Sequence, residues 1–230
     1  MKPNLALVAA IRDRLEAAGD PIKARRMQAY MKSEMPYRGV PSPARRAIER
    51  EVFAAHSLSS YEEWFDTILA LWRDAGHREE RYCAVELTGL RRYSAHRRME
   101  TLPLYEEMIV SGAWWDHVDA VAVHLVGDLL RRRPARMRPV IHAWSVSPDL
   151  WLRRAAIISQ VTSRRDTDFR LLCAVIQPNL GDRDFFIRKA IGWALRSYAW
   201  VDPDAVRTYV EDLGPSINPL SRTEALKNIG

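Results

Sequence analysis

Hydrophobic residues recur every three or four positions along almost the whole chain, and the alternating pattern typical of strands is nearly absent. The predicted helices cover residues 3–18, 22–34, 42–56, 60–73, 78–91, 101–111, 115–133, 135–144, 149–162, 166–177, 183–198, 203–212 and 219–228. Short breaks rich in Gly, Asp and Pro separate them, such as Gly19-Asp20-Pro21 and Gly214-Pro215. The pattern predicts an all-α fold. Because no low-complexity linker divides the chain, it also predicts one domain over residues 1–230.

The second half of the chain repeats itself. Three segments begin 35 residues apart: WDHVDAVAV at Trp115, LWLRRAAII at Leu150 and FFIRKAIGW at Phe185. A fourth, ERYCAVELT at Glu80, fits more loosely. In each of the three, a polar residue stands four places after the first residue and is followed by Ala; these polar residues are Asp119, Arg154 and Lys189. Such a period predicts a helical-repeat solenoid, in which equivalent positions form a ladder along one concave face.

Charge and motifs narrow the class of protein. The chain has 35 Lys and Arg residues against 29 Asp and Glu, a net charge of +6, which favours an anionic partner such as nucleic acid. No stretch is apolar enough to span a membrane, and no signal-peptide cleavage site is present, so a cytoplasmic protein without a membrane partner is expected. GxSxG, P-loop and GxGxxG motifs are absent, and the two cysteines form no CxxC pair. We therefore expect no cofactor and no metal.

Trp115 and Asp119 are the first candidates for chemistry. They are four residues apart and so share a helix face, where an aromatic ring and a carboxylate together suit a cationic ligand. A structural interpretation is also open: Asp116 can cap the helix, with Asp119 in its first turn near the positive end of the dipole. An unpaired buried carboxylate is expensive, so either a neighbour or a ligand must compensate Asp119.

The two arginines of the second repeat point in different directions. The register with Asp119 places Arg154 on the ladder, where a phosphate contact is expected. Arg153 is then expected to form a surface ion pair, for example with Asp149 four residues earlier. Alternatively, both arginines join neighbouring repeats.

Aromatic residues elsewhere offer further candidates. Trp193 lies one turn beyond Lys189, where it either opposes Trp115 across the groove or belongs to the core. Tyr30 is equally ambiguous. In PSPARR at 41–46, Ser42 is expected to cap a helix and Arg45 to meet phosphate, and a plain capped surface helix is the alternative.

Two further patterns receive structural interpretations. His117, His124 and Asp128 share one predicted helix, but the histidines lack the H-x-x-x-H spacing that places two imidazoles on one ion, so no metal site is predicted. The RRRP run at 131–134 is interpreted as a helix C-terminus, where cations suit the dipole.

Five segments, in order along most of the chain, resemble those of the AlkD-type DNA alkylation repair enzymes, which are alkylpurine DNA glycosylases built from HEAT-like helical repeats. They are AYMKSEMPYRGVPSPARR (29–46), SGAWWDHVDAVAVHLVG (111–127), WLRRAAI (151–157), FFIRKAIGWALRSY (185–198) and INPLSRTEALK (217–227). The resemblance implies that Asp119 is the catalytic carboxylate and that Trp115 and Trp193 flank the lesion. It also implies that Arg154 contacts the DNA backbone and that Tyr30 is a further cleft residue. Where the family often has a polar residue, this chain has Pro41.

The activity implied by the resemblance is excision of cationic N3- or N7-alkylpurines from duplex DNA, without the base flipping of other glycosylases. A carboxylate stabilises the positive charge that develops on the sugar, and arginines hold the backbone. No lysine adjoins Asp119, so a monofunctional enzyme is expected, and no sequence feature indicates an oligomer. The alternatives are a catalytically silent HEAT-like module that binds nucleic acid and a protein–protein scaffold.

Overall fold

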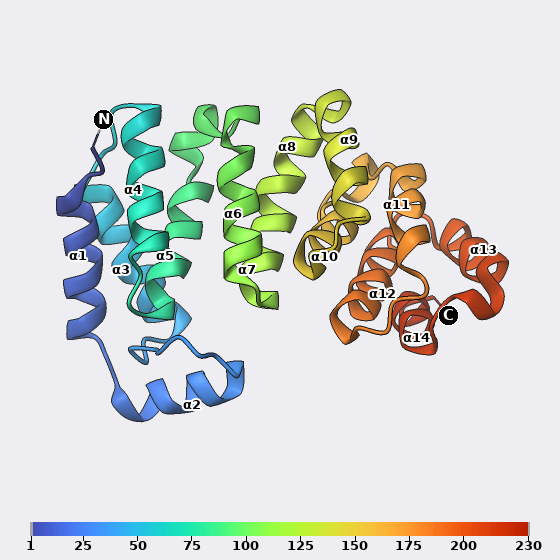
Figure 1. Cartoon of the computed structure of the whole chain (residues 1–230), viewed down its shortest axis with the longest axis horizontal. Coiled ribbons are helices and arrows are strands. Elements are labelled where there is room, and N and C mark those ends of the chain that lie inside the picture. Colours follow the sequence, from blue (N-terminus) through green and yellow to red (C-terminus); the bar gives the residue numbers. More distant parts are fainter. Residues whose placement is uncertain (1, 230) are drawn as a thin grey trace. The chain divides into compact units, whose positions relative to one another are not determined.

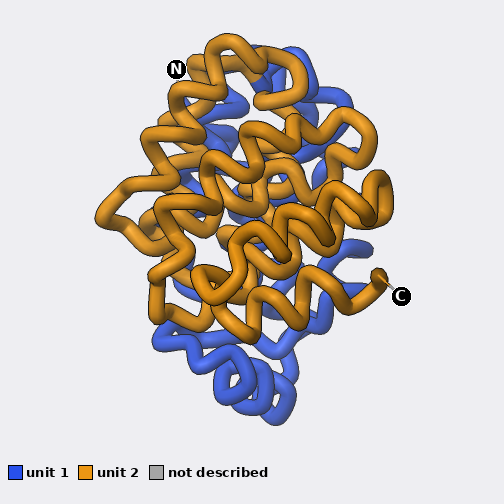
Figure 2. Tube along the Cα trace, turned by 90° about the vertical axis from the view of Figure 1, so that its right-hand side faces the viewer, with its two compact units in different colours: residues 1–97 blue, residues 98–230 orange. Residues whose placement is uncertain are grey.

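The structure is a computed structural model that describes residues 2–229, and all regular secondary structure in this part of the chain is helical (Figure 1). The all-α prediction is therefore confirmed. Contacts between residues divide the chain into two compact units, residues 1–97 and 98–230, which Figure 2 shows in blue and orange. The single domain over residues 1–230 stays a prediction.

Unit 1 consists of five α-helices and a 3-10 segment. They are α1 (Leu5–Ala17), α2 (Pro21–Met31), α3 (Ser42–Ala55), α4 (Tyr61–Arg73), α5 (Arg78–Gly89) and η1 (Arg91–His96). Helix α1 packs against α3, α4 and α5 around a core that includes Leu7, Trp64 and Trp72. Fully burying such large side chains supplies most of the stabilisation of a unit of this size.

A buried carboxylate fixes the segment that leads into α3. Glu79 of α5 is fully buried, and its two oxygens accept hydrogen bonds from the backbone N–H groups of Arg38, Gly39 and Val40 at 2.9–3.1 Å. Gly39 has a φ of +84°, and a Cβ there would lie 2.1 Å from the carbonyl oxygen of Asp20. The chain takes this tight path because a glycine stands at that position.

Unit 2 stacks helix on helix. Its α-helices are α6 (Leu102–Gly112), α7 (Trp115–Ala120), α8 (Gly127–Arg132), α9 (Pro134–Ser145), α10 (Leu150–Ile158), α11 (Phe169–Ile176), α12 (Phe185–Ala199), α13 (Pro203–Leu213) and α14 (Pro219–Leu226). The shorter segments are η2 (Met99–Thr101), η3 (Val121–Val126), η4 (Arg164–Asp166), η5 (Gln177–Asn179) and η6 (Gly214–Ser216). Helix α7 packs on α10 and α10 on α12, which is the order that the 35-residue period predicts, and α12 packs in turn on α14. The helical-repeat fold is thus confirmed.

The predicted helix 115–133 is continuous but not uniform. Helices α7 and α8 are joined end to end through η3, which is a π-helical segment. A π-helical stretch widens the turn and often lies next to a functional site. Here it begins two residues after Asp119.

Helix ends differ from the sequence-based predictions where the backbone leaves the helical region. The predicted helix 22–34 ends at Met31 because Lys32 adopts a left-handed φ of 48°. The predicted helix 149–162 ends at Ile158, and a turn follows it. Arg132 ends α8 and Pro134 begins α9, which confirms the predicted helix C-terminus in the RRRP run. Among the described helices, none is long and apolar enough to cross a membrane.

Gly127, the first residue of α8, tests how closely the repeats approach one another. A Cβ at this position would lie 2.3 Å from the carbonyl oxygen of Ser159, so Gly127→Ala is expected to lower the free energy of unfolding by about 1–3 kcal/mol. Without this clash, Ala would stabilise a helix by about 1 kcal/mol relative to Gly. Thermal and urea unfolding measure the difference. Gly181→Ala, where a Cβ meets no atom within 4 Å, is the control, and a stabilised Gly127→Ala would contradict the close approach.

Candidate functional site

Asp119 and Arg154 form a two-point ion pair between successive repeats. Nε of Arg154 donates to Oδ1 of Asp119 at 2.7 Å, and Nη2 donates to Oδ2 at 2.8 Å. The Arg154 side chain is 6% exposed and the Asp119 side chain 18%. Parallel hydrogen bonds from a guanidinium fork to a carboxylate are among the strongest and most directional in proteins. The carboxylate is therefore compensated from within the protein and stays partly exposed to solvent.

Arg154 also reaches the next repeat. Its third nitrogen, Nη1, donates to the backbone carbonyl of Phe186 in α12 at 2.6 Å. One side chain on α10 thus contacts both α7 and α12, since it lies in the second turn of α10 between them. The interpretation that arginine joins neighbouring repeats is supported by this geometry. Because all three nitrogens donate within the protein, a direct phosphate contact by Arg154 stays a prediction that requires one of these bonds to open.

The ionisation of Asp119 reflects two opposing effects. Burial raises the pKa of Asp119 above its ordinary value, and the negative charge of Asp116 acts in the same direction. The hydrogen bonds and positive charge of Arg154 lower the pKa of Asp119. A guanidinium stays charged at any physiological pH and so favours the ionised carboxylate opposite it.

Aromatic side chains surround the ion pair. Trp115, one turn before Asp119 on α7, is 36% exposed. Trp114, Trp151 and Phe186 form a cluster with ring centroids 5.1–6.1 Å apart. The guanidinium of Arg154 lies 5.9 Å from the centre of the Phe186 ring. The Phe186 ring therefore covers part of the buried Arg154, and the exposed Trp115 stands one turn from the partly exposed Asp119 on the same helix.

The ladder has a fourth member that the sequence analysis missed. Lys189 of α12 forms an ion pair of 2.9 Å with Glu224 of α14, and Arg196 donates to the same carboxylate. Glu224 stands 35 residues after Lys189 and is followed by Ala225, so the period itself carried the signal. The four ladder residues therefore form two ion pairs, Asp119 with Arg154 and Lys189 with Glu224. Trp193, on α12 between these cations, is half-buried.

Two structural expectations around the repeats are wrong. Arg153 pairs with Asp182 at 3.0 Å and not with Asp149. Asp149 instead caps α10, where it accepts hydrogen bonds from the backbone N–H groups of Trp151 and Leu152. Asp116 does not cap α7, because the N-cap position belongs to Trp114 and its side chain makes no capping bond. The Asp149 carboxylate at the start of α10 thus satisfies backbone N–H groups that have no partner within the helix.

The candidate residues of unit 1 lie apart from one another. Tyr30 on α2 is 81% exposed. Ser42 is exposed but does not cap α3, because Pro41 is the N-cap residue and no side chain caps this helix; the capping prediction is wrong. Arg45 pairs with Glu49 one turn later and lies over the Tyr82 ring, 5.2 Å from its centre. Its guanidinium is therefore bound inside unit 1.

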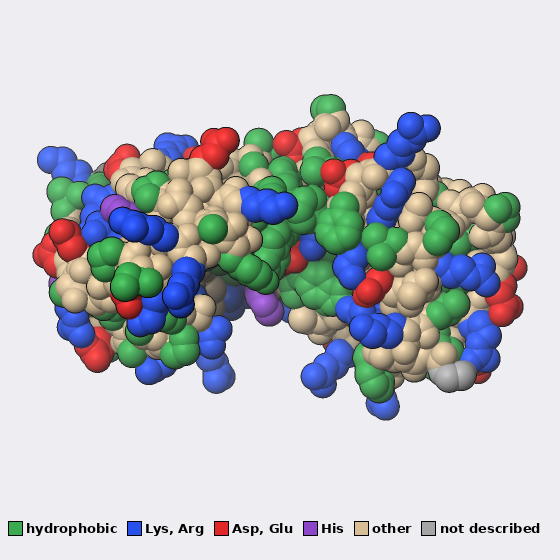
Figure 3. All heavy atoms as spheres, turned by 90° about the horizontal axis from the view of Figure 1, so that it is seen from below, with side chains coloured by type: hydrophobic (Ala, Val, Ile, Leu, Met, Phe, Trp, Pro, Cys, Tyr) green, Lys and Arg blue, Asp and Glu red, His purple; other side chains and the backbone are tan. Residues whose placement is uncertain are grey.

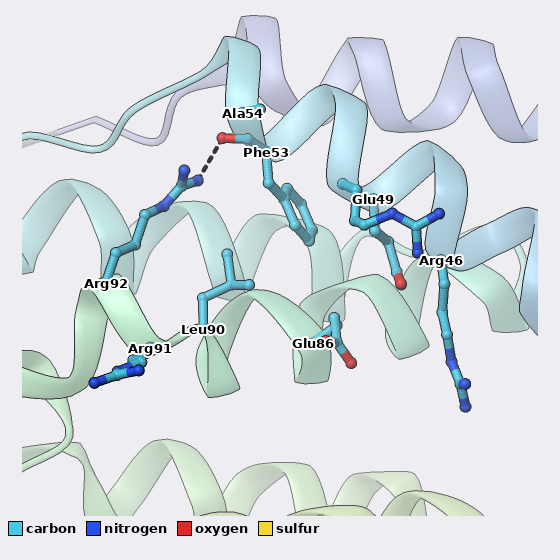
Figure 4. Close-up of a pocket in the computed structure, with 9 residues that line it drawn as sticks. Arg46, Glu49, Phe53, Ala54, Glu86, Leu90, Arg91 and Arg92 are labelled. Atoms are coloured by element: carbon cyan, nitrogen blue, oxygen red, sulfur yellow. Dashed lines mark hydrogen bonds between the residues drawn. The ribbon is translucent and has the colours of Figure 1, made fainter.

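A basic hollow of about 450 Å³ lies between α3 and the end of α5 in unit 1 (Figure 4). Phe53 and Leu90 point toward one another at its centre, and Arg92 donates to the carbonyl of Phe53. Arg46 and Arg91 are exposed at its sides. Arg46, rather than its neighbour Arg45, is thus the exposed cation of the PSPARR segment.

In Figure 3 Lys and Arg side chains are spread among hydrophobic ones over the face seen from below. Within residues 2–229, no group of three or more His, Cys, Asp and Glu side chains is placed to hold a metal ion. His117 is fully buried, whereas His124 on the same helical run is exposed. The charged side chains of the two units therefore suit electrostatic interactions with a charged ligand, whether cationic or anionic.

Comparison with known proteins identifies a family and a similar solved structure. The family model described as "DNA alkylation repair enzyme" matches residues 11–229. The chain is similar to a solved structure described as a predicted DNA alkylation repair enzyme from Enterococcus faecalis. The two share 28% sequence identity and superpose with a TM-score of 0.81, over 92% of this chain and 97% of that one. No curated protein matches.

The ion pair makes a testable contribution to stability. Arg154→Gln leaves the Asp119 carboxylate largely buried without its cation, so the free energy of unfolding at neutral pH is expected to fall by about 3 kcal/mol. The variant also raises the pKa of Asp119 further, because both lowering effects of Arg154 are lost. Protonation then removes the uncompensated charge, so the difference from the parent should narrow as the pH falls.

Urea unfolding at neutral and mildly acidic pH measures this difference. Arg153→Gln is the matched control, because it removes the neighbouring, more exposed pair with Asp182 and should cost about 1 kcal/mol. Two results would show that Arg154 does not stabilise ionised Asp119. One is an equal loss of unfolding free energy in the two variants, and the other is a difference between the parent and Arg154→Gln that widens as the pH falls.

Proposed function

Because the chain belongs to the family of DNA alkylation repair enzymes, we propose that it is a monofunctional DNA glycosylase that removes cationic N3- or N7-alkylated purines from duplex DNA. A role in the repair of alkylated DNA follows from the family. The glycosylase reaction and its substrates are the proposal, and the Asp119–Arg154 pair supports them.

One observation supports the proposal: Arg154 holds the Asp119 carboxylate in a fixed orientation, the carboxylate stays partly exposed, and an exposed indole, Trp115, stands one turn earlier on the same helix. Trp115 and Asp119 lie one turn apart on α7, and Asp119 keeps 18% of its side chain exposed. A purine that carries a full positive charge is attracted to both the ring face and the carboxylate. A protein that only bound the DNA backbone would gain nothing from a carboxylate facing a polyanion.

The chemistry needs no strong acid. Alkylation at N3 or N7 makes the purine cationic and hence a good leaving group, so the C1′–N bond breaks with its electron pair moving into the ring, which becomes neutral. Positive charge then develops on the sugar, and the Asp119 carboxylate stabilises it. A carboxylate has about four lone-pair sites, so two bonds from Arg154 leave room to orient the attacking water. Water's oxygen bonds to C1′, and its proton passes to Asp119 or to solvent.

The remaining residues take supporting roles in this proposal. Trp115 and Trp193 hold the cationic nucleoside, and Arg154 is a positioning residue that fixes Asp119. Lys189, whose side chain is 36% exposed, and the exposed Tyr30 and Ser42 are proposed to contact DNA together with Arg45. We propose that the enzyme acts as a monomer without a cofactor or metal, in the cytoplasm and on the nucleoid.

Base release tests the proposal directly. In single-turnover reactions on duplex DNA that contains N7-methylguanine, Asp119→Asn is expected to slow release by about 100- to 1000-fold, because the amide lacks the charge that stabilises the transition state. Asp116→Asn is the matched control, since it removes a carboxylate three residues away on the same helix and should keep release within a few-fold of the parent. Free base is quantified by chromatography.

Either of two results would overturn this assignment. A parent protein that binds duplex DNA in a salt-dependent manner but releases no base would be the catalytically silent binding module. An Asp119→Asn variant as fast as the parent would remove Asp119 from the chemistry.

The pH dependence of release gives a second test. Release requires ionised Asp119, so the rate should rise with pH through the raised pKa of this group. Asp116→Asn removes a negative charge that raises the pKa of Asp119, so the acid limb of the profile should move to lower pH. Arg154→Lys, a weaker partner, should move the acid limb to higher pH. Superimposable profiles for the three proteins would mean that another group controls the acid limb.

A further inference from the structure

Unit 2 has a hollow of its own, separate from the one in unit 1. It lies toward the C-terminal ends of the helical runs that carry Asp119 and Arg154. It measures about 1150 Å³ and lies where α8, α10 and α12 end. Its polar and aromatic lining includes Ser163, Arg164, Arg165, Asp166, Ser197 and Trp200. Lys189 and Ser197 are eight residues apart on α12, so the hollow begins about 12 Å along the helix axis from the ladder. It is a separate surface.

The hollow is positively charged. Arg131, Arg164 and Arg165 line it, against the single carboxylate of Asp166. Within residues 2–229, Arg164 and Arg165 are exposed and form no ion pair, unlike Arg154 or Arg45. Helix C-termini carry partial negative charge, so an anion is attracted here by the guanidinium groups and not by the helices. Two free guanidinium groups on adjacent residues suit a phosphate, which each can bind through two hydrogen bonds.

The backbone holds these arginines in a defined turn. The turn η4 is closed by hydrogen bonds from Asp166 N to Ser163 O at 3.0 Å and from Thr167 N to Arg164 O at 3.1 Å. Ser163 is buried and its hydroxyl lies 3.3 Å from Nη1 of Arg131, which connects the turn to the end of α8. Arg164 has a φ of +51°, a left-handed conformation that costs a side-chain residue about 1 kcal/mol. A glycine would take this conformation more readily, yet the chain has arginine.

Trp200 adds an aromatic surface beside the charges. It follows α12, lines the same hollow and is 76% exposed. A tryptophan buries a large apolar area in most folded proteins, so one left open next to unpaired arginines is suited to a flat ligand. Nucleic-acid bases stack on such rings when they are unpaired, and adjacent cations hold the backbone phosphate.

We propose that this hollow binds a single-stranded segment of nucleic acid, with an unpaired base stacked on Trp200 and the neighbouring phosphate held by Arg164 and Arg165. A paired base in a duplex cannot offer its face to the ring, so the site selects unpaired strands. An acidic peptide would use the same arginines but would not need the indole. The inference does not depend on base excision.

Fluorescence anisotropy with a short, undamaged, fluorescein-labelled oligothymidylate tests it on the full chain. Trp200→Ala is expected to weaken binding roughly 5- to 100-fold, the range for loss of one base–aromatic stack. Trp200→Phe keeps a ring face and should recover much of the affinity. Arg164→Gly removes a cation where glycine suits the backbone, and should lower the salt slope of binding by about 0.7.

Matched control variants distinguish binding at this hollow from binding by the overall positive charge of the protein. Arg170→Gln removes an exposed arginine of α11 that does not line the hollow, and should leave binding nearly unchanged. Asp166→Asn removes the one carboxylate of the lining and should tighten binding.

Three results would overturn the proposal: wild-type affinity in Trp200→Ala, equal losses for Arg164→Gly and Arg170→Gln, or an equal effect of Trp200→Ala on a fully paired duplex. Loss of polyglutamate binding through Arg164→Gly, together with no effect of Trp200→Ala on the oligothymidylate, would identify an acidic-peptide surface instead. The test contains no alkylated base, so its result is independent of whether the protein proves to be a glycosylase.

Discussion

The ion pair between Asp119 and Arg154 is the constraint on which the rest of unit 2 depends. A largely buried carboxylate needs a nearby cation, and Arg154 supplies one through two hydrogen bonds while its third nitrogen donates to the carbonyl of Phe186. One guanidinium thereby fixes the spacing of α7, α10 and α12. The same contact fixes the orientation of the partly exposed Asp119 carboxylate, one turn from the exposed Trp115 on α7. Stability and the proposed chemistry therefore rely on the same atoms, and a substitution at Arg154 must affect both.

The period of the sequence predicted which positions are equivalent but not which of them pair. Asp119, Arg154 and Lys189 were expected to form one open ladder, and the order of their helices agrees. The pairing depends on how far each side chain reaches and on which neighbour is acidic, and neither follows from spacing alone. Arg154 reaches back to Asp119, whereas Lys189 reaches forward to Glu224. Extending the period by one more repeat identifies Glu224, so this position of the ladder could have been predicted from the sequence.

In unit 1 the local pattern was less informative. Ser42 has the residue type of a helix cap, but the preceding Pro41 lies in extended conformation at the N-cap position, and α3 begins at Ser42 itself. Arg45 has Glu49 one turn later, and burial of that carboxylate requires a cation close by. The i, i+4 spacing of the two residues could have indicated this pair. The path of the chain before α3 depends on the buried Glu79, a contact between residues forty positions apart that no local pattern reveals.

A net positive charge alone does not tell which arginines are available to a ligand. Arg45, Arg153 and Arg154 are bound to carboxylates of the protein itself, and for each of them a phosphate must compete with a contact already made. Arg164 and Arg165 have no such partner among the described residues and stand beside an exposed ring. The repeats of unit 2 thus differ at their two ends: at one end charges are neutralised in pairs around a single open carboxylate, and at the other they remain available. In the proposed roles, the fixed charge of Asp119 serves the chemistry, and the free charges of Arg164 and Arg165 serve strand binding.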